Sequence, residues 1–225
     1  MNARIFLLAL ALFFTTGTLA TPFFAQTQPQ AQGSEPAAQD EVVMFVQKLQ
    51  NELENGDLNA AIDLYKDLPK SLDSNADLKL LHASLLFSAK RYAQADEIVK
   101  ELSSNPSARK DALEIKAQID MATNNNSSLQ NTLNQLLASD PYNSTANIIL
   151  GNQQALRKKY KVAANYYKKA LTGDGENQEA LFGYGQMNYY LGDLETSRTQ
   201  FEKLLQIDSE NPSAYYYLGK LSAED

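Results

Sequence analysis

Residues 180–201 read ALFGYGQMNYYLGDLETSRTQF and place Gly183, Gly185 and Gly192 in a segment that is otherwise typical of helix. The first two glycines form a G-x-G, a pattern that also opens the phosphate-binding loops of nucleotide enzymes. Those loops follow a strand and carry a third glycine at a fixed spacing, and this segment has neither. The glycines therefore need another explanation, which the spacing of similar residues elsewhere in the chain supplies.

Small residues recur along the chain with a period of 34. Gly151, Gly185 and Gly219 are 34 residues apart, and Ala83 and Ala117 continue the series towards the N-terminus. Two more sets of residues recur with the same period. Mostly small residues stand at Ala61, Ala95, Leu129, Ala163 and Ser197, and large apolar residues stand at Tyr65, Val99, Leu133, Tyr167 and Phe201. A fixed period of this length indicates an array of repeats, each of which buries its apolar face against its neighbours.

The pattern resembles the tetratricopeptide repeat (TPR) family, whose 34-residue units follow W-x2-L-G-x2-Y, then A-x3-F, then P. The best match is Leu150-Gly151 with Ala163 and Tyr167, whereas the terminating proline is kept only at Pro141. The resemblance implies an all-α fold, a right-handed α–α superhelix (TPR solenoid) of five full 34-residue repeats plus a C-terminal capping helix. The expected repeats span residues 42–75, 76–109, 110–143, 144–177 and 178–211, and the capping helix spans residues 212–225.

Single residues fit this array to different degrees. In the TPR pattern Gly185 lies where two helices cross and Gly192 ends a helix, whereas Gly183 lowers helix stability for no reason visible in the sequence. Pro69 is expected to end or kink the second helix of the first repeat. His82 falls at a packing position of the second repeat, so we interpret it as a structural rather than a catalytic histidine.

The N-terminus has the pattern of a signal peptide. Arg4 is followed by an apolar stretch and then by small residues up to Ala20, as in exported proteins. We predict a signal peptide at residues 1–20, with Ala25 as an alternative cleavage point and an uncleaved anchor as the other open possibility. Residues 21–41 are predicted to be a flexible linker. Without cysteine the chain is not a lipoprotein, and the expected location is exported, periplasmic or secreted, in a bacterium.

Composition disfavours several classes of function. The chain has no cysteine, one histidine and a formal net charge of −7. Disulfides, thiol nucleophiles and multi-histidine metal sites are therefore ruled out, and no cofactor or metal is expected. The negative charge argues against nucleic acid as a partner. We predict that the protein is not an enzyme.

Two surfaces are candidate binding sites. The resemblance implies a concave groove lined by the first helix of each repeat, and in the C-terminal half that lining is aromatic, which favours protein binding. The alternative is that several of these rings pack in the core. The predicted groove residues are Phe87, Ile148, Asn152, Leu156, Phe182, Gln186, Tyr189, Tyr190 and Tyr216. The second surface, termed the basic patch, comprises Arg157, Lys158, Lys159 and Lys161; it would dock an acidic or phosphorylated partner, unless it is only a solvated face.

We interpret the chain as a non-catalytic protein–protein interaction scaffold or adaptor of the bacterial cell envelope, which binds a partner segment in the groove. The mature form is expected to have no membrane span. Two alternatives stay open. One is a periplasmic carrier of a small apolar ligand that works with a transporter. The other is a structural homo-oligomer that self-associates through the C-terminal end, where Tyr215, Tyr216 and Tyr217 are consecutive.

Overall fold

The computed structural model describes residues 36–224, which form two compact units. Unit 1 ends at Thr123 and unit 2 begins at Asn124. The predicted signal peptide at residues 1–20, and the predicted linker as far as residue 35, lie outside the described residues.

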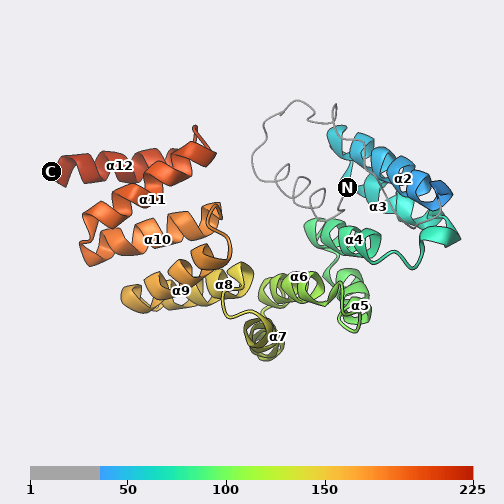
Figure 1. The fold of residues 1–225 in the computed structure, drawn as a ribbon, viewed down its shortest axis with the longest axis horizontal. Coiled ribbons are helices and arrows are strands. Elements are labelled where there is room, and N and C mark those ends of the chain that lie inside the picture. The colour runs from blue at the N-terminus through green and yellow to red at the C-terminus, as the bar shows by residue number, and fades with distance from the viewer. Residues whose placement is uncertain (1–35, 225) are drawn as a thin grey trace. The chain divides into compact units, whose positions relative to one another are not determined.

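The described part of the chain is built from helices and turns, without strands (Figure 1). Unit 1 contains α2 (Pro36–Glu54), α3 (Leu58–Asp63), the 3₁₀ helices η1 (Leu64–Asp67) and η2 (Lys70–Leu72), α4 (Ala76–Ser88), α5 (Tyr92–Leu102) and α6 (Arg109–Ala122). Unit 2 contains α7 (Asn126–Ser139), α8 (Ser144–Leu156), α9 (Tyr160–Gly173), α10 (Gln178–Leu191), α11 (Leu194–Ile207) and α12 (Pro212–Glu224). Within unit 2, α10 packs against α9 and α11, and also contacts α8 and α12.

Asparagine fixes where most first helices of the repeats begin. Its Oδ1 accepts a hydrogen bond from the backbone N–H three residues later and so satisfies one of the free donors at the helix start. The distances are 3.0, 2.9, 3.1 and 3.0 Å at Asn75, Asn143, Asn177 and Asn211, ahead of α4, α8, α10 and α12. At the equivalent position before α6 the chain has Arg109 instead of asparagine. This helix begins at Arg109, one residue earlier than the register predicts, and Ala108 before it makes no side-chain cap.

The turns between paired helices share one backbone conformation. Gly56, Lys90, Asn124, Lys158 and Gly192 lie at the same position of successive turns and have φ angles of 77, 58, 55, 58 and 79°. Glycine adopts this left-handed conformation without strain and asparagine tolerates it, whereas lysine is disfavoured there. The backbone of the turn is therefore repeated even where the sequence does not favour it.

Two close contacts between helices hold unit 2 together, and an aromatic ring fills each of them. Tyr167 of α9 is 3% exposed and Phe201 of α11 is fully buried. A Cβ added to Gly151 would lie 2.9 Å from the Tyr167 ring, and one added to Gly185 would lie 2.9 Å from Phe201. Gly183 is tighter still, since its Cβ would lie 2.5 Å from Tyr167 Cε1. This close approach is the reason for Gly183 that the sequence alone did not reveal.

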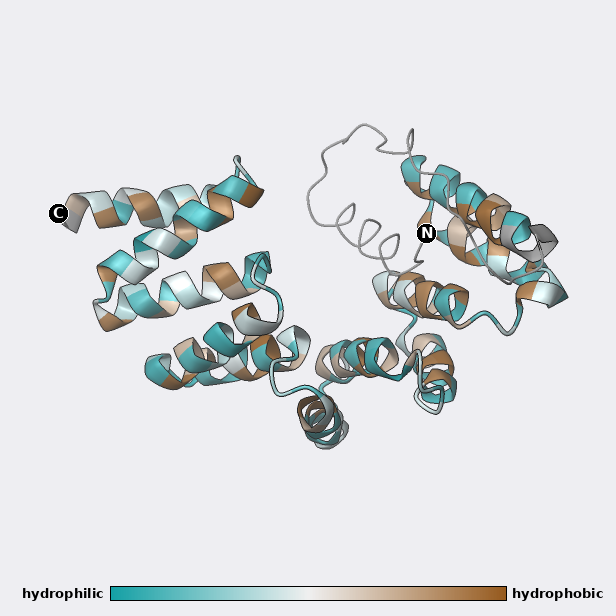
Figure 2. Cartoon of the chain, viewed as in Figure 1, coloured by the Kyte–Doolittle hydropathy of each residue, from teal (hydrophilic) through white to brown (hydrophobic). Residues whose placement is uncertain are grey.

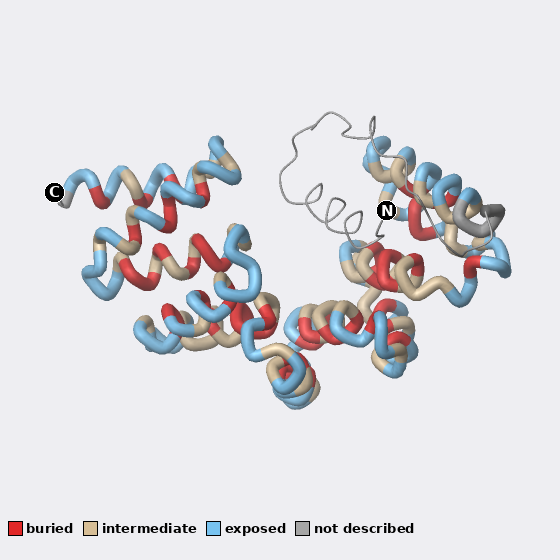
Figure 3. The backbone as a smooth tube through the Cα atoms, in the orientation of Figure 1, coloured by how far each residue is buried: buried red, intermediate tan, exposed pale blue. Residues whose placement is uncertain are grey.

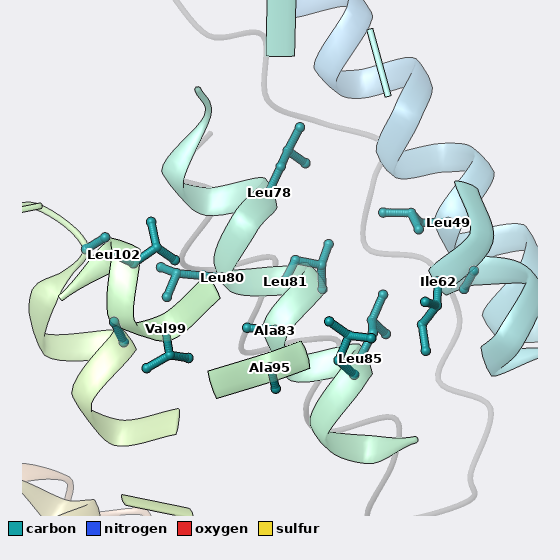
Figure 4. Close-up of a cluster of buried hydrophobic side chains, with 14 of the residues drawn as sticks. Leu49, Ile62, Leu78, Leu80, Leu81, Ala83, Leu85, Ala95, Val99 and Leu102 are labelled. Atoms are coloured by element: carbon teal, nitrogen blue, oxygen red, sulfur yellow. The ribbon is translucent and has the colours of Figure 1, made fainter. Parts of the chain in front are cut away.

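Unit 1 has its own apolar core (Figure 4). The fully buried Ala83 of α4 and Ala95 of α5 lie where these helices meet. Leu80 extends from α4 towards Val99 of α5, and Leu85 extends towards the side of α3 that carries Ile62 (Figure 4). Apolar residues recur at helical spacing along the described helices of both units (Figure 2), and so do the buried residues (Figure 3). None of the helices in the described residues is long and apolar enough to cross a membrane.

The first repeat departs from the expected boundaries. α2 begins at Pro36, inside the predicted 21–41 linker, because proline is well suited to the first turn of a helix, where its missing N–H is not needed. α3 ends at Asp63, ahead of Pro69, and the chain continues as η1. Leu68 has ψ 127°, as expected for a residue that precedes proline. The second helix of this repeat is therefore shorter than the sequence predicts.

Candidate partner-binding site

An aromatic cluster at the C-terminal end of unit 2 is centred on Tyr217 of α12. This ring is buried at 7% exposure and stacks on Phe201, with centroids 4.9 Å apart and an interplanar angle of 9°. Phe182, Tyr189 and Tyr216 contact it edge-on, with centroids 5.8, 5.5 and 5.3 Å away. Stacked and edge-to-face rings stabilise one another beyond the area that they bury. The cluster is thus a packed platform on α10, α11 and α12.

Hydrogen bonds fix the polar edge of this platform. Gln186 Nε2 donates to the Tyr217 hydroxyl at 2.7 Å, and the Tyr190 and Tyr217 hydroxyls are 3.5 Å apart. The hydrogen bond with Tyr217, and then partial burial, raise the pKa of Tyr190. Gln186 is therefore engaged inside the cluster, where it satisfies a buried hydroxyl.

Part of the cluster is open to solvent. Tyr190 is 49% exposed and Tyr216 is 58% exposed. The Lys220 ammonium lies 4.8 Å from the centroid of the Tyr216 ring and 5.6 Å from that of Tyr189, within the range of cation–π attraction. The Tyr216 hydroxyl, through a hydrogen bond, raises the pKa of Lys220. The exposed rings and this cation form a surface on top of the buried platform.

Tyr160 joins this surface to the basic patch. It is the first residue of α9 and stacks on Tyr190, with centroids 5.0 Å apart and an interplanar angle of 26°. Lys159 and Lys161 flank it in sequence, and all four residues of the basic patch are exposed. We term Tyr160, Tyr190, Tyr189 and Tyr216 the aromatic strip. The groove and the basic patch, predicted as separate surfaces, meet at the Tyr160–Tyr190 stack.

The other predicted groove residues differ from one another in how far they are exposed. Ile148 is only 6% exposed and belongs to an apolar cluster of unit 2, so its prediction as a groove residue is wrong. Asn152 accepts a hydrogen bond from the Tyr167 hydroxyl and donates to Glu179 Oε1 at 2.9 Å, which makes it part of the helix packing. Leu156 is 86% exposed. Each residue occupies the repeat position that the register gives it, but its exposure depends on its neighbours.

Two more predicted residues are mainly structural. Phe182 is partly buried against the apolar cluster around Phe201 and Tyr217, and the Phe182 and Phe201 centroids are 6.0 Å apart. Phe87 belongs to unit 1 and packs on Tyr92 at 5.6 Å. The binding candidate that remains is therefore confined to unit 2.

Sequence reasoning missed two members of the site. Tyr160 was not predicted as a site residue, and Tyr217 was considered only for self-association, whereas the repeat register does place Lys220 on the groove face. The register relates Tyr217 to Gly183, since the two residues are 34 apart. The structure shows that Gly183 faces the Tyr167 ring, and Tyr217 correspondingly packs on Phe201, the residue 34 after Tyr167. No comparable signal marks Tyr160.

Unit 1 contains a separate hollow of about 300 Å³, to which Ile62, His82 and Ile98 contribute. The His82 ring stacks on Tyr65, with centroids 4.0 Å apart, and burial lowers the pKa of His82 to about 4. Burial also raises the pKa of Tyr65, whose hydroxyl has no hydrogen-bond partner in the described part of the chain. No group of three or more histidine, cysteine or acidic residues in residues 36–224 is placed to hold a metal ion.

Comparisons with known proteins agree with this architecture. Residues 185–224 match a family model described as a TPR repeat, and no curated protein sequence matches the chain. A TPR protein from Parabacteroides merdae superposes with a TM-score of 0.54 at 17% identity, covering 81% of this chain and 72% of its own. PilF of Pseudomonas aeruginosa gives 0.54 at 14% identity, with coverages of 82% and 99%.

A third solved structure, MamA from Desulfovibrio magneticus, gives a TM-score of 0.51 at 16% identity, and covers 77% of this chain and 98% of its own. At these identities the likeness concerns the fold, and it confirms the predicted all-α repeat class. The count of five full repeats stays a prediction. Residues 185–224 thus match a TPR repeat, and most of the chain has the fold of tetratricopeptide repeat proteins.

Proposed function

We propose that this protein is a non-catalytic scaffold that binds a segment of another protein on the aromatic strip of unit 2. The observation that carries the proposal is the exposure of Tyr190 and Tyr216, at 49% and 58%, beside a packed platform whose rings they contact edge-on. Large rings that lose little freedom on binding are efficient anchors for protein partners. A platform of this kind needs no chemistry of its own.

The N-terminal pattern supports a place in the bacterial cell envelope. An exported chain with a positive start, an apolar stretch and small residues before Ala20 is expected to be cleaved there. We expect the mature protein to begin at Thr21, and mass spectrometry of its N-terminal peptide checks this. A first residue of Gln26 would move the cleavage to Ala25, and an intact Met1 on an exported chain would mean that the segment is kept as an anchor.

A pull-down from an envelope extract tests the scaffold function. The bait is the full mature chain, compared with a Tyr190→Ser/Tyr216→Ser variant, which removes the exposed rings and spares the partly buried Phe182 and Tyr189. Tyr142→Ser is the matched control, because Tyr142 is a 48% exposed tyrosine of the same unit outside the strip. Mass spectrometry is expected to find partners that the double variant loses and the control keeps.

Two results would count against the proposal. Partners retained equally by wild type and double variant would mean that binding occurs elsewhere on the chain. No partner with any bait, together with a concentration-dependent increase in mass in light scattering, would favour the homo-oligomer, for which Tyr215 and Tyr216 at the surface of α12 are suited.

A further inference from the structure

Charge on the surface of unit 2 is distributed unevenly. The chain as a whole has a formal net charge of −7, yet four of the five residues from 157 to 161 are basic. None of these four cations forms an ion pair within residues 36–224, although the chain is rich in carboxylates. Asp193, in the following turn, uses Oδ1 to cap α11 by accepting from the Thr196 N–H at 3.1 Å. The basic patch therefore projects an uncompensated positive field into solvent.

This positive field adjoins the half-buried Tyr160 and, through it, the exposed Tyr190. Tyr160, between Lys159 and Lys161, stacks on Tyr190 at 5.0 Å. At the other end of the aromatic strip, the Lys220 ammonium lies over the Tyr216 and Tyr189 rings. Cations therefore lie at both ends of the aromatic strip, of which Tyr160 and Tyr189 are half-buried and Tyr190 and Tyr216 are exposed. The surface thus has aromatic rings with cations on either side. It is complementary to a peptide chain that carries both apolar side chains and carboxylates.

The same turn in unit 1 lacks this arrangement. Lys90 has the same φ as Lys158, 58°, and is followed by Arg91 and Tyr92. However, the Arg91 guanidinium donates to Asn59 Oδ1 at 2.7 Å, and Tyr92 packs on Phe87. The equivalent cation, Arg91, is thus engaged within unit 1, whereas Lys159 of unit 2 is exposed; the equivalent rings, Tyr92 and Tyr160, are both half-buried. Lys90 is consequently a matched control for Lys158.

We infer that the occupant of this surface is an acidic peptide segment of a partner protein, which places carboxylates against the basic patch and Lys220 and apolar side chains against Tyr190 and Tyr216. This inference rests on the proposed function and names its partner class. An acidic peptide is favoured over a polyanion such as an anionic membrane, because a chain of net charge −7 is repelled by an extended negative surface beyond the small basic patch.

Selection from a random peptide display library tests the partner class directly. The full mature chain is the bait, and the expected result is enrichment of peptides that combine Asp or Glu with Phe, Tyr, Leu or Trp. Fluorescence anisotropy then gives the Kd of an enriched peptide. For Lys158→Glu/Lys161→Glu, affinity is expected to fall about tenfold or more, with most of the change in the association rate and with a weaker salt dependence. Lys90→Glu is expected to leave Kd unchanged.

The possible outcomes separate this inference from the proposed function. If enriched peptides are neutral or basic and their binding is lost only in Tyr190→Ser/Tyr216→Ser, the inference fails and the scaffold function stands. If no peptide binds, both fail. Binding to phosphatidylglycerol vesicles that Lys158→Glu/Lys161→Glu abolishes would replace the peptide with a membrane. A dimer in sedimentation analysis that the same variant dissociates would replace it with a second copy. Thermal unfolding of each variant verifies that it is folded.

Discussion

Gly183 shows how a residue that weakens its own helix stabilises the unit around it. Glycine costs about 1 kcal/mol in a helix interior relative to alanine. At this position the Tyr167 ring occupies the space of the missing Cβ, since an added Cβ would lie 2.5 Å from Cε1 and 2.6 Å from Cζ. The close contact between α9 and α10 therefore depends on the glycine, and the glycine pair is a packing feature rather than a ligand-binding loop.

Gly183→Ala is expected to destabilise the protein by about 1–2 kcal/mol, because overpacking at Tyr167 outweighs the gain in helix propensity. Gly219→Ala is the control: Gly219 also lies inside a helix, α12, but nothing lies within 4 Å of its added Cβ. That variant is expected to gain about 0.5–1 kcal/mol. Urea unfolding measures both, and equal changes in the two variants would contradict the packing role.

His82 makes the stability of the protein depend on pH. Burial lowers its pKa from the ordinary value of 6.5 to about 4. Between these values the unfolded chain binds a proton that the folded chain does not, so the free energy of unfolding falls as the pH is lowered through this range. The contribution is present above about pH 6.5 and is lost as the pH falls towards 4.

From pH 7.5 to pH 5, wild type is expected to lose about 1 kcal/mol more stability than His82→Phe, after allowance for the solvent that reaches the partly exposed ring. Phenylalanine keeps the stacking on Tyr65 and removes the titration. Because the chain has a single histidine, its NMR titration is unambiguous. A midpoint near 6.5 would show that the ring is not buried as described.

At the scale of elements, the 34-residue register predicts helix positions well because capping and turn geometry repeat with it. α4, α8, α10 and α12 begin at Ala76, Ser144, Gln178 and Pro212, the residues at which the register starts its units. The register fails where a local residue overrides it. Pro36 allows α2 to begin earlier than predicted. The second helix of the first repeat, α3, ends at Asp63, before Pro69.

Lysine in a left-handed turn is expected to cost stability. Lys90 has φ 58°, a conformation that Gly56 and Gly192 adopt in the equivalent turns. Lys90→Gly is expected to stabilise the protein by about 0.5–1 kcal/mol, because the clash with Cβ disappears. Thermal unfolding checks this against Gly192→Ala, which introduces the clash and is expected to lose about 1 kcal/mol. Stabilisation by both substitutions would contradict the repeated turn geometry.

The site was less predictable than the helices. The register assigned Tyr190 and Tyr216 to a candidate binding face, and both are exposed. It assigned Ile148 to the same face, yet Ile148 is buried. Periodicity gives the direction in which a side chain leaves its helix, whereas exposure depends on which side chains cover it. The Tyr160–Tyr190 stack, which joins two predicted surfaces, depends on contacts between helices that no spacing encodes.

At the scale of the whole molecule, we propose that the aromatic strip of unit 2 is the surface with which this protein binds another protein. Packed rings below, exposed rings above and cations at both ends are properties of one continuous surface. The rest of the described chain supports this surface. Its helices pack closely at glycines, begin at asparagine caps and are joined by turns of repeated geometry. Because the chain has a formal net charge of −7, its other surfaces are expected to attract an acidic segment less strongly than the basic patch does.

Site-specific photo-crosslinking in the producing cell tests that claim most directly. A photoreactive phenylalanine analogue replaces Tyr190, Tyr216 or, as the control, Tyr142, which is exposed in the same unit outside the strip. We expect irradiation to join a partner protein to the chain from positions 190 and 216 and not from position 142. Adducts of equal yield from all three positions, or adducts from position 142 alone, would contradict it.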